Sequence, residues 1–402
     1  MSVNTMTFQQ IATVLNEIVH QATGKEAITP TNTSEFVSVA QTALSLGNDA
    51  VMNAISNVLS RTIFAIRPYS AKFVRLEKDL PRWGAYMRKL SIADSDWADD
   101  DAYKYPVTYD ASQTPATGDG GMVDQWKIKK PNILQTNFFG QSIYADHITI
   151  FEDQLETAFR SPEELGSFLS LIMTNLENRL EMSRDAISRG LVANMIGALL
   201  TEDDPNRVVH LLTEYNTQTG LSLTATSVYQ PDNFPAFMKW VYSRVAQISD
   251  LMTENSLMYQ TVITGKEVLR HTPMMNQKIY LYSPAQHQID SRVLADTYHD
   301  NYLKYADVES VNFWQSIKTP DAVNVTPAYT NTSGAVVTGT AVNQTGIFGL
   351  MFDEDAMGYA LLDRRMVPTQ VNASGLYRNL FVHAKQKVFM DNTEKAVVLL
   401  LD

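Results

Sequence analysis

The sequence predicts an α+β protein with two or three lobes, and three observations support this fold class. Its 402 residues exceed the roughly 250 to 300 at which a single hydrophobic core usually stops growing. An amphipathic helical pattern runs from Ser161 to about Leu200. Residues 205–342 mix helical and strand-like patterns, and from Gly346 onward the pattern is that of strands. We therefore expect a long helix that is followed by a mixed α/β lobe and then by a closing sheet.

Composition excludes several classes of function. Hydrophobic residues make up 45% of the chain and aromatic residues 10%, as in proteins that bury a core. The absence of cysteine removes disulfide frameworks, thiolate metal sites and cysteine nucleophiles. The net charge of −12 argues against a dedicated nucleic-acid binder, because phosphate contacts need clustered Lys and Arg. The sequence predicts neither a secretion signal nor a membrane span, since no window holds roughly 18 uninterrupted apolar residues.

Residues 1–70 carry two helical patterns. The first places Phe8 and Val19 on one apolar stripe and stops at Gly24, while the second begins near Phe36 and resumes as far as Leu59. A short helix with one apolar face needs another part of the protein, or another subunit, to cover that face. Two interpretations stay open: a helical subdomain of the core, or an arm that packs on neighbouring subunits.

Residues 71–135 form a long polar excursion broken by prolines, with short strand-like pieces such as Tyr103–Tyr109. The stretch from Lys72 to Lys89 holds six basic and two acidic residues, whereas five aspartates follow between Asp94 and Asp101. Such blocks are typical of a solvated loop, but opposite neighbouring blocks also suit head-to-tail pairing between identical copies. On the second interpretation the candidate contact residues are Arg82, Arg88, Lys89, Asp99, Asp100 and Asp101.

The long helix has a strong start. Residues 133–151 alternate in polarity and predict one or two strands, after which Ser161 supplies an N-cap hydroxyl, Pro162 stands at the first helical position and Glu164 completes a capping box. At 1.5 Å per residue the helix would be about 58 Å long. Such a helix spans a lobe rather than fitting inside one.

The remaining pattern divides into an α/β stretch and closing strands. Within 205–342 we expect a helix capped by Asp232 or Asn233 and reaching Leu251, a buried strand at Met258–Thr264, a helix at Pro284–Tyr298, a strand at Ala306–Trp314, and a loop or edge hairpin over Thr319–Asn343. The closing strands are expected at Ile347–Phe352, Gly358–Leu362, Leu380–Ala384 and Ala396–Leu401, with a turn at Asn372–Gly375.

No motif for catalysis, cofactors or metals is complete. Gly265-Lys266 lacks the upstream glycine of a phosphate loop. The run 353–358 resembles a calcium loop, but Met357 stands at a liganding position and Arg364 where the bidentate glutamate belongs. His287 and His299 are too far apart to share a helical face well. The sequence therefore predicts no catalytic residue, cofactor or metal site.

The order of these parts, and above all the closing stretches Gly346-Ile347-Phe348-Gly349-Leu350-Met351-Phe352 and Asn379-Leu380-Phe381-Val382-His383-Ala384, resembles the Hong Kong 97-type major capsid proteins of tailed phages. The resemblance covers most of the chain. It implies an amino-terminal helical arm at 1–70, an extended loop at 71–135, a peripheral domain at 136–204 and 343–402 with its spine helix at 161–200, and an axial α/β domain at 205–342.

The same resemblance implies a function in structure rather than catalysis. It implies a head protein that self-assembles into pentamers and hexamers of an icosahedral shell around phage double-stranded DNA, with only non-specific proximity to that DNA and no membrane contact. Implied partners are further copies of the chain, portal and scaffolding proteins and decoration proteins, with assembly in the host cytoplasm. Two alternatives stay open: an encapsulin-type cellular shell protein, and a soluble α/β enzyme with an unrecognised site.

Overall fold

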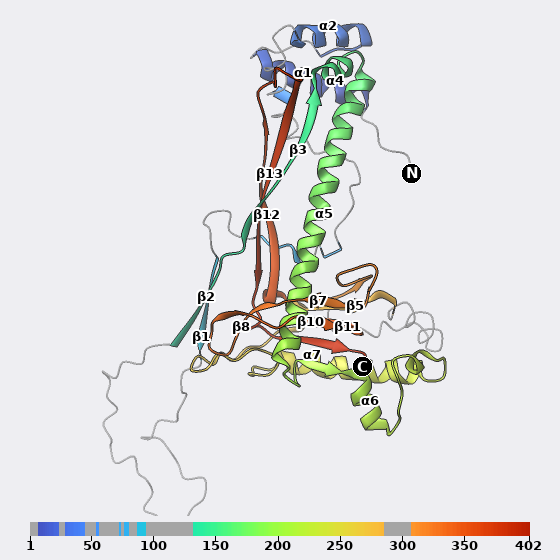
Figure 1. Ribbon diagram of the computed structural model, residues 1–402, viewed down its shortest axis with the longest axis vertical. Helices are drawn as coiled ribbons and strands as arrows, with labels where there is room; N and C mark the ends of the chain where they lie inside the picture. The colour runs from blue at the N-terminus through green and yellow to red at the C-terminus, as the bar shows by residue number, and fades with distance from the viewer. Residues whose placement is uncertain are drawn as a thin grey trace, which may run out of the picture.

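The computed structural model describes residues 7–23, 29–44, 54–55, 72–73, 76–79, 87–93, 132–284 and 307–402. It has an elongated shape, and helix α5 (Pro162–Glu202) runs along most of its length beside a narrow sheet (Figure 1). The amino-terminal helices gather at one end, which we call the distal lobe. A five-stranded sheet with its helices forms the other end, which we call the basal lobe. The α+β class is confirmed.

Helix α5 confirms the strongest expectation from the sequence. Ser161 is the N-cap, its Oγ accepts a hydrogen bond from the backbone N–H of Glu164 at 3.2 Å, and Pro162 opens the helix. The helix ends at Asp203, which adopts the left-handed conformation with a φ of 49°. Its 41 residues correspond to about 61 Å. One end packs into the core of the distal lobe and the other into that of the basal lobe.

The distal lobe combines helices with an antiparallel three-stranded sheet in the order β12-β13-β3. Its core joins Leu15 of α1, Phe36 of α2, Leu169 of α5 and Leu380 of β13, all with no exposed surface. The amphipathic faces of α1 and α2 thus find their partner within the chain. The elements are α1 (Phe8–Thr23), α2 (Thr33–Leu44), β3 (Gln141–Phe151), α4 (Glu152–Ala158), β12 (Met357–Pro368) and β13 (Tyr377–Met390).

The basal lobe is a sheet in the order β4-β14-β11-β5-β6, covered on both faces. Along β14, Val397 and Leu399 face a core shared with α6 and α7, while Val398 and Leu400 face a core shared with the end of α5. The strand is apolar throughout because both of its faces are buried. The elements are β4 (Val208–His210), α6 (Leu211–Thr219), α7 (Phe234–Thr253), β5 (Gln277–Tyr282), β6 (Asp307–Val311), β11 (Ile347–Asp353) and β14 (Ala396–Leu400), with short helices η3 (Ser227–Tyr229), η4 (Met274–Asn276) and η5 (Glu354–Ala356).

Small two-stranded pairs complete the described structure. β1 (Met87–Ala93) and β2 (Asn132–Phe138) form an antiparallel ribbon, which marks the base of the excursion predicted from the sequence. The Thr/Asn-rich segment forms two nested hairpins, in agreement with the expected edge hairpin. Their strands are β7 (Val323–Val325), β8 (Ala328–Thr330), β9 (Val336–Thr338) and β10 (Val342–Gln344).

One sequence expectation about secondary structure was wrong, and two others are refined by the structure. Met258–Thr264 is a loop, buried at Tyr259–Thr261 and Ile263, rather than a strand, because Tyr259 has a φ of 67° and interrupts any extended run. The expected cap position of α7 is confirmed at Asn233, although its side chain donates to the carbonyl of Ser227 and makes no capping hydrogen bond. Within residues 343–402, β12 and β13 lie in the sheet beside α5, whereas β11 and β14 pair with β5 and β4 of the basal lobe.

Some elements of the structure had no expectation from the sequence, and some expected elements fall on residues that the structure does not describe. The strand β5 and the helix α6 were both missed, because short apolar runs do not distinguish buried strand from buried helix. The expected strand Tyr103–Tyr109 lies outside the described residues. The second helical pattern is described as α2 and at residues 54–55, and the rest of its continuation to Leu59 lies outside the described residues. So does the expected helix Pro284–Tyr298 beyond its first residue.

Candidate assembly interface

The β1–β2 ribbon presents an apolar face to solvent. Leu90 and Ile92 alternate with partly buried residues along β1 and are 62% and 72% exposed. Ile133 of β2 lies directly opposite Ile92 and is 48% exposed. Arg88 shares this face, two residues before Leu90. We call these four residues the ribbon outer face; exposed apolar clusters of this kind are typical of protein contact surfaces.

The opposite face of the ribbon is held against the body of the chain. Lys89 Nζ donates to Asp391 Oδ2 at 2.8 Å and also pairs with Glu394. The ring of Phe138 lies 5.7 Å from that of Phe389. Because Asp391 is 1% exposed, this ion pair lies in a largely desolvated setting and fixes the direction in which the ribbon leaves the body.

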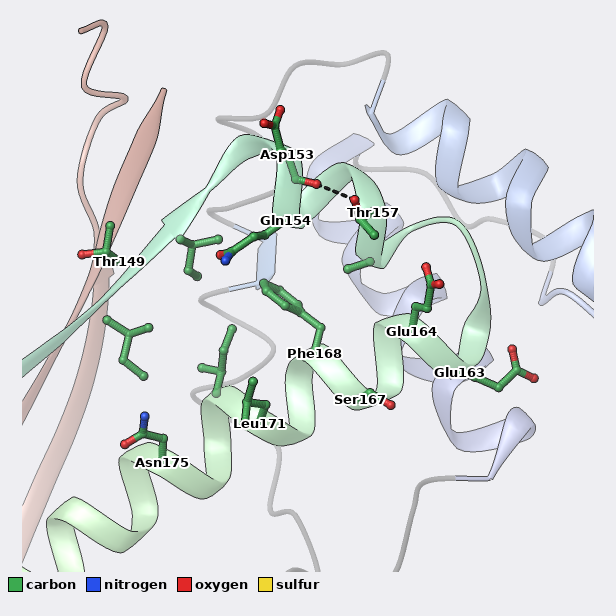
Figure 2. A pocket seen from close by; sticks show the side chains of 14 residues that line it. Thr149, Asp153, Gln154, Thr157, Glu163, Glu164, Ser167, Phe168, Leu171 and Asn175 are labelled. Carbon is green, nitrogen blue, oxygen red and sulfur yellow. Dashed lines mark hydrogen bonds between the residues drawn. The ribbon is translucent and has the colours of Figure 1, made fainter. Parts of the chain in front are cut away.

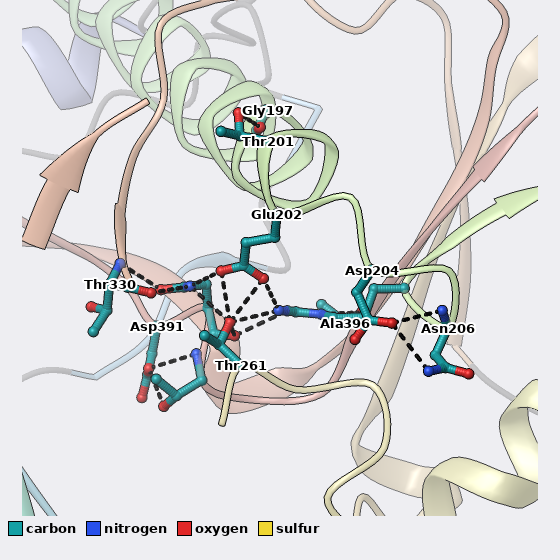
Figure 3. Close-up of polar contacts among 12 residues, drawn as sticks. Gly197, Thr201, Glu202, Asp204, Asn206, Thr261, Thr330, Asp391 and Ala396 are labelled. Carbon is teal, nitrogen blue, oxygen red and sulfur yellow. Dashed lines mark hydrogen bonds and ion pairs between the residues drawn. The ribbon is translucent and has the colours of Figure 1, made fainter. Parts of the chain in front are cut away.

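The partner of Lys89 belongs to a turn of five consecutive polar residues that is almost entirely buried. Residues 391–395 connect β13 to β14, and none of them is more than 6% exposed. Asn392 donates to Glu202 at the end of α5, to Thr261 and to the carbonyl of Thr330. Figure 3 shows Glu202 reaching from the end of α5 toward Thr261. The turn thereby joins the ribbon, α5 and the hairpin segment.

A buried arginine reinforces the same junction. Arg207 has no exposed surface, pairs with Glu202, and donates to Thr261 Oγ1 at 2.6 Å and to the carbonyl of Asn392 at 2.9 Å. Burial lowers the pKa of Arg207 from its ordinary value despite its acidic neighbours. A charge this deeply buried is tolerated only when its donors are matched, so the network specifies one arrangement of these segments.

The two ends of the turn, Asp391 and Lys395, carry opposite charges and have different partners. Burial opposes ionisation of Asp391, but the Lys89 ammonium and the Thr393 hydroxyl outweigh it and hold the pKa of the Asp391 carboxyl below its usual value. At the other end Lys395 donates to the carbonyls of Met252 and Glu254, which terminate α7. Burial lowers the pKa of Lys395 to about 8, although the carboxylates nearby act in the opposite direction.

The distal lobe carries a groove of about 710 Å³ between β3, α4 and α5. Figure 2 shows Phe168 extending from α5 toward α4, with the carboxylates of Asp153, Glu163 and Glu164 around the margin. Leu171 in its wall is 70% exposed. No histidine, lysine or arginine lines the groove, and its titratable side chains are the carboxylates of Asp153, Glu163 and Glu164.

In the calcium-like run 353–358, the carboxylates of Asp353 and Asp355 are engaged by protein donors. Asp353 accepts hydrogen bonds from the N–H of Asp355 and from the hydroxyl of Thr272, and Asp355 pairs with Lys78 at 2.8 Å. Within the described parts of the chain, no cluster of three or more His, Asp or Glu side chains has a geometry suited to a metal ion. Among the same residues, no helix has the length and apolar character of a membrane span.

The structure places two of the six sequence-predicted contact residues. Arg88 and Lys89 occupy opposite faces of β1, whereas Arg82, Asp99, Asp100 and Asp101 lie outside the described residues. Lys89 finds carboxylates in its own chain. Sequence reasoning missed the buried turn 391–395; the available signal was a run of five polar residues between two strongly apolar strands.

Comparisons with known proteins point to one family. A family model described as Phi29-like phage major capsid protein matches residues 11–400. The chain is 11% identical to one in the capsid structure of Staphylococcus phage Andhra, with a TM-score of 0.51 over 85% of this chain and 87% of that one. It is 10% identical, with the same TM-score and coverage, to a chain in the structure of the head fiber and inner core protein gp22 of native bacteriophage P68. No curated protein matches it.

Proposed function

Because the chain belongs to the Phi29-like phage major capsid protein family, we propose that it assembles into the pentamers and hexamers of an icosahedral shell that encloses phage double-stranded DNA. It is a structural protein of the virion capsid, and the Hong Kong 97-type fold expected from the sequence agrees with its structural neighbours. The family assignment decides against the cellular shell protein that the sequence left open. The absence of catalytic activity is part of the proposal.

The observation that carries this proposal is the ribbon outer face. Three apolar side chains, Leu90, Ile92 and Ile133, are exposed on a ribbon whose other side is clamped to the body by Lys89. Burying such a face against another copy recovers roughly 25 cal/mol for each Å² of apolar surface removed from water. The clamp lowers the entropy cost of that contact, because the ribbon is already oriented in the free subunit.

We assign the proposed roles in assembly to residue ranges that largely follow the lobes. Residues 1–70 form a helical arm whose helices α1 and α2 pack into the distal core of the same chain. Residues 71–135 act as an extended loop that lies across a neighbour, and 136–204 with most of 343–402 act as a peripheral domain stiffened by α5. Residues 205–342 form the axial domain that meets its copies around the five- and six-fold axes. We include β11 and β14 in this proposed axial domain, because they pair with β5 and β4. Portal, scaffolding and decoration proteins are the further proposed partners, and assembly takes place in the host cytoplasm.

Negative-stain microscopy of the purified full chain tests the proposal. Closed particles of uniform diameter are the expected result. A monodisperse monomer at high concentration, under conditions that also include a scaffolding protein from the same phage, would refute self-assembly. The substitution Ile92→Asp gives a sharper test, because a carboxylate at the centre of the ribbon outer face leaves the subunit core untouched and should abolish particles.

A further inference from the structure

The groove of the distal lobe has an apolar floor and an apolar wall. Ile150, Ala158 and Ile172 form the floor and are buried members of the distal core. Phe168 is partly buried in the wall, and Leu171, which follows it by about one helical turn, is 70% exposed. The groove thus opens the edge of the distal core to solvent. An exposed apolar surface with a polar rim is typical of a protein contact site.

The groove runs along the amino-terminal part of α5, and β3 and α4 form its other wall (Figure 2). β3 is an edge strand, since the sheet of the distal lobe has the order β12-β13-β3, and no further strand of the described structure covers this side. The α5 residues that line the groove extend from Glu163 to Asn175, which corresponds to about 18 Å. That length accommodates about three turns of a second helix.

The charge around the groove is of one sign. We call the following residues the margin carboxylates: Asp153, Glu163 and Glu164. All three are exposed, and within the described residues none of them forms an ion pair. Residues 152–164 hold five carboxylates and a single cation, Arg160, which does not line the groove. Further along the same lobe, Arg179 and Arg364 are already paired with carboxylates. The margin therefore carries an excess of negative charge.

The positions of these carboxylates at helix starts explain part of this charge. Two of them lie in the first turn of α5 and one in the first turn of α4, where a carboxylate stabilises a helix. Helix stabilisation does not require an exposed leucine two turns further along α5, nor the absence of cations from the lining. The apolar wall and the charged margin together indicate a partner that supplies both apolar side chains and cations.

We propose that the groove is a docking site for an amphipathic helix of a separate protein. This helix is about three turns long, with apolar side chains on one face and Lys or Arg on its flanks. Its apolar face covers Phe168 and Leu171, and its cations pair with the margin carboxylates, as in other complexes in which a helix binds in a groove. The inference goes beyond the proposed function, because the groove belongs to the single subunit and does not depend on a shell.

The partner is a separate protein because the described helices of this chain offer almost no free cation. Among them only α5 and α7 contain Lys or Arg. The three arginines of α5 pair with carboxylates of their own chain, and Arg244 of α7 pairs with Glu214. Lys239 alone is left among these helices. Nucleic acids and anionic lipids do not fit either, because the margin carboxylates repel phosphate groups.

Binding of synthetic peptides to the unassembled full chain tests the proposal. The probe is a fluorescent peptide of about 14 residues of Leu, Ala and Lys, with leucines every three or four residues. One comparison peptide carries Glu in place of each Lys, and another has the same composition in scrambled order. Fluorescence anisotropy should show that the probe binds at least tenfold more tightly than either comparison peptide. Failure of the probe to bind the unmodified chain would overturn the proposal.

Three variants locate the binding energy, and circular dichroism should be unchanged in all of them. L171Q removes the exposed apolar anchor, and glutamine has nearly the helix propensity of leucine. D153N/E163Q/E164Q neutralises the margin carboxylates without changing their size. Each should weaken binding of the probe at least tenfold. The matched control D232N/D250N/E267Q removes three exposed carboxylates of the basal lobe and should bind like the unmodified chain. An equal loss in the control would show attraction to net charge alone and refute the proposal.

Two further measurements identify the occupant. A photo-crosslinking group on the central leucine of the probe should mark residues between 148 and 175, and marks confined to other segments would contradict the proposed site. Sedimentation equilibrium of the subunits tests a second copy as the occupant. Dimers that L171Q abolishes would assign the groove to a contact between copies, and the proposal would be wrong. These measurements use subunits, so their outcome is independent of whether closed particles form.

Discussion

The ion pair between Lys89 and Asp391, which we call the ribbon clamp, holds the β1–β2 ribbon to the body. Its removal by Lys89→Met should destabilise the subunit far more than removal of a second ion pair in the same region of the sequence. Lys89 has 26% of its side-chain surface exposed and its partner Asp391 only 1%, so the substitution leaves a buried carboxylate without its cation. Breaking a buried pair in this way costs roughly 3 to 5 kcal/mol. Thr393 still donates to Asp391, and Arg270 still pairs with Glu394. We therefore expect a loss of about 2 to 3 kcal/mol in the free energy of unfolding.

The matched control is Lys78→Met. Lys78 pairs with Asp355 at the same 2.8 Å, but the Asp355 side chain is 73% exposed and water replaces the lost partner. Its removal should cost about 0 to 1 kcal/mol. Urea unfolding of unassembled subunits, followed by circular dichroism and analysed by linear extrapolation, measures both values. Equal losses for the two variants would refute the argument that burial of Asp391 makes this clamp strong.

The clamp also has a pH dependence of defined sign. Because the folded pKa of Asp391 is depressed, its contribution is fully present above the unfolded value of about 3.9 and is lost as pH falls through the lower folded value. In the Lys89→Met variant the cation that depresses this pKa is gone. The acid limb of its stability profile should therefore begin at higher pH than in the unmodified chain, which urea midpoints between pH 3 and pH 6 would reveal.

Three further predictions concern single side chains. Lys395 has its pKa lowered by burial from 10.5 to about 8, so the folded chain binds fewer protons than the unfolded chain between these values; stability should rise across this pH window, and the rise should be missing in Lys395→Met when urea midpoints are compared. Ser161→Ala removes the N-cap acceptor of α5 and should cost about 1 kcal/mol, while far-ultraviolet circular dichroism stays unchanged. Gly197→Ala and Gly190→Ala should have opposite signs. A Cβ at Gly197 would meet Val325 at 2.5 Å and cost about 1 to 3 kcal/mol. A Cβ at Gly190 meets nothing within 4 Å and should stabilise the helix by up to about 1 kcal/mol; thermal midpoints of both variants check this contrast.

Local patterns explain which elements were predictable. The start of α5 depends on Ser161, Pro162 and Glu164, all within one helical turn, so the sequence holds the whole capping interaction. The closing strands were predictable in the same way, since their apolar runs and the turn at 372–375 are local features. The run at Met258–Thr264 shows the limit. Its apolar composition reflects burial, but its backbone follows the partners that surround it, including Asn392.

The candidate interface was predictable only in part. Arg88 and Lys89 were both named from the charge pattern, yet nothing in the sequence distinguishes the residue that faces solvent from the one that pairs with Asp391 about 300 positions later. The apolar side chains of the ribbon outer face were not singled out. An isolated Ile or Leu between polar residues predicts a core position as readily as a contact surface.

The sequence by itself determined the α+β class, the capped helix of α5, the strands at the end of the chain and the family resemblance. These features depend on periodicity and on neighbours a few residues apart. Only the tertiary structure decided that β11 and β14 belong to the basal lobe and that residues 391–395 are buried. Each of these depends on pairing between distant segments, and the free energy of such pairing comes from partners that no local window contains.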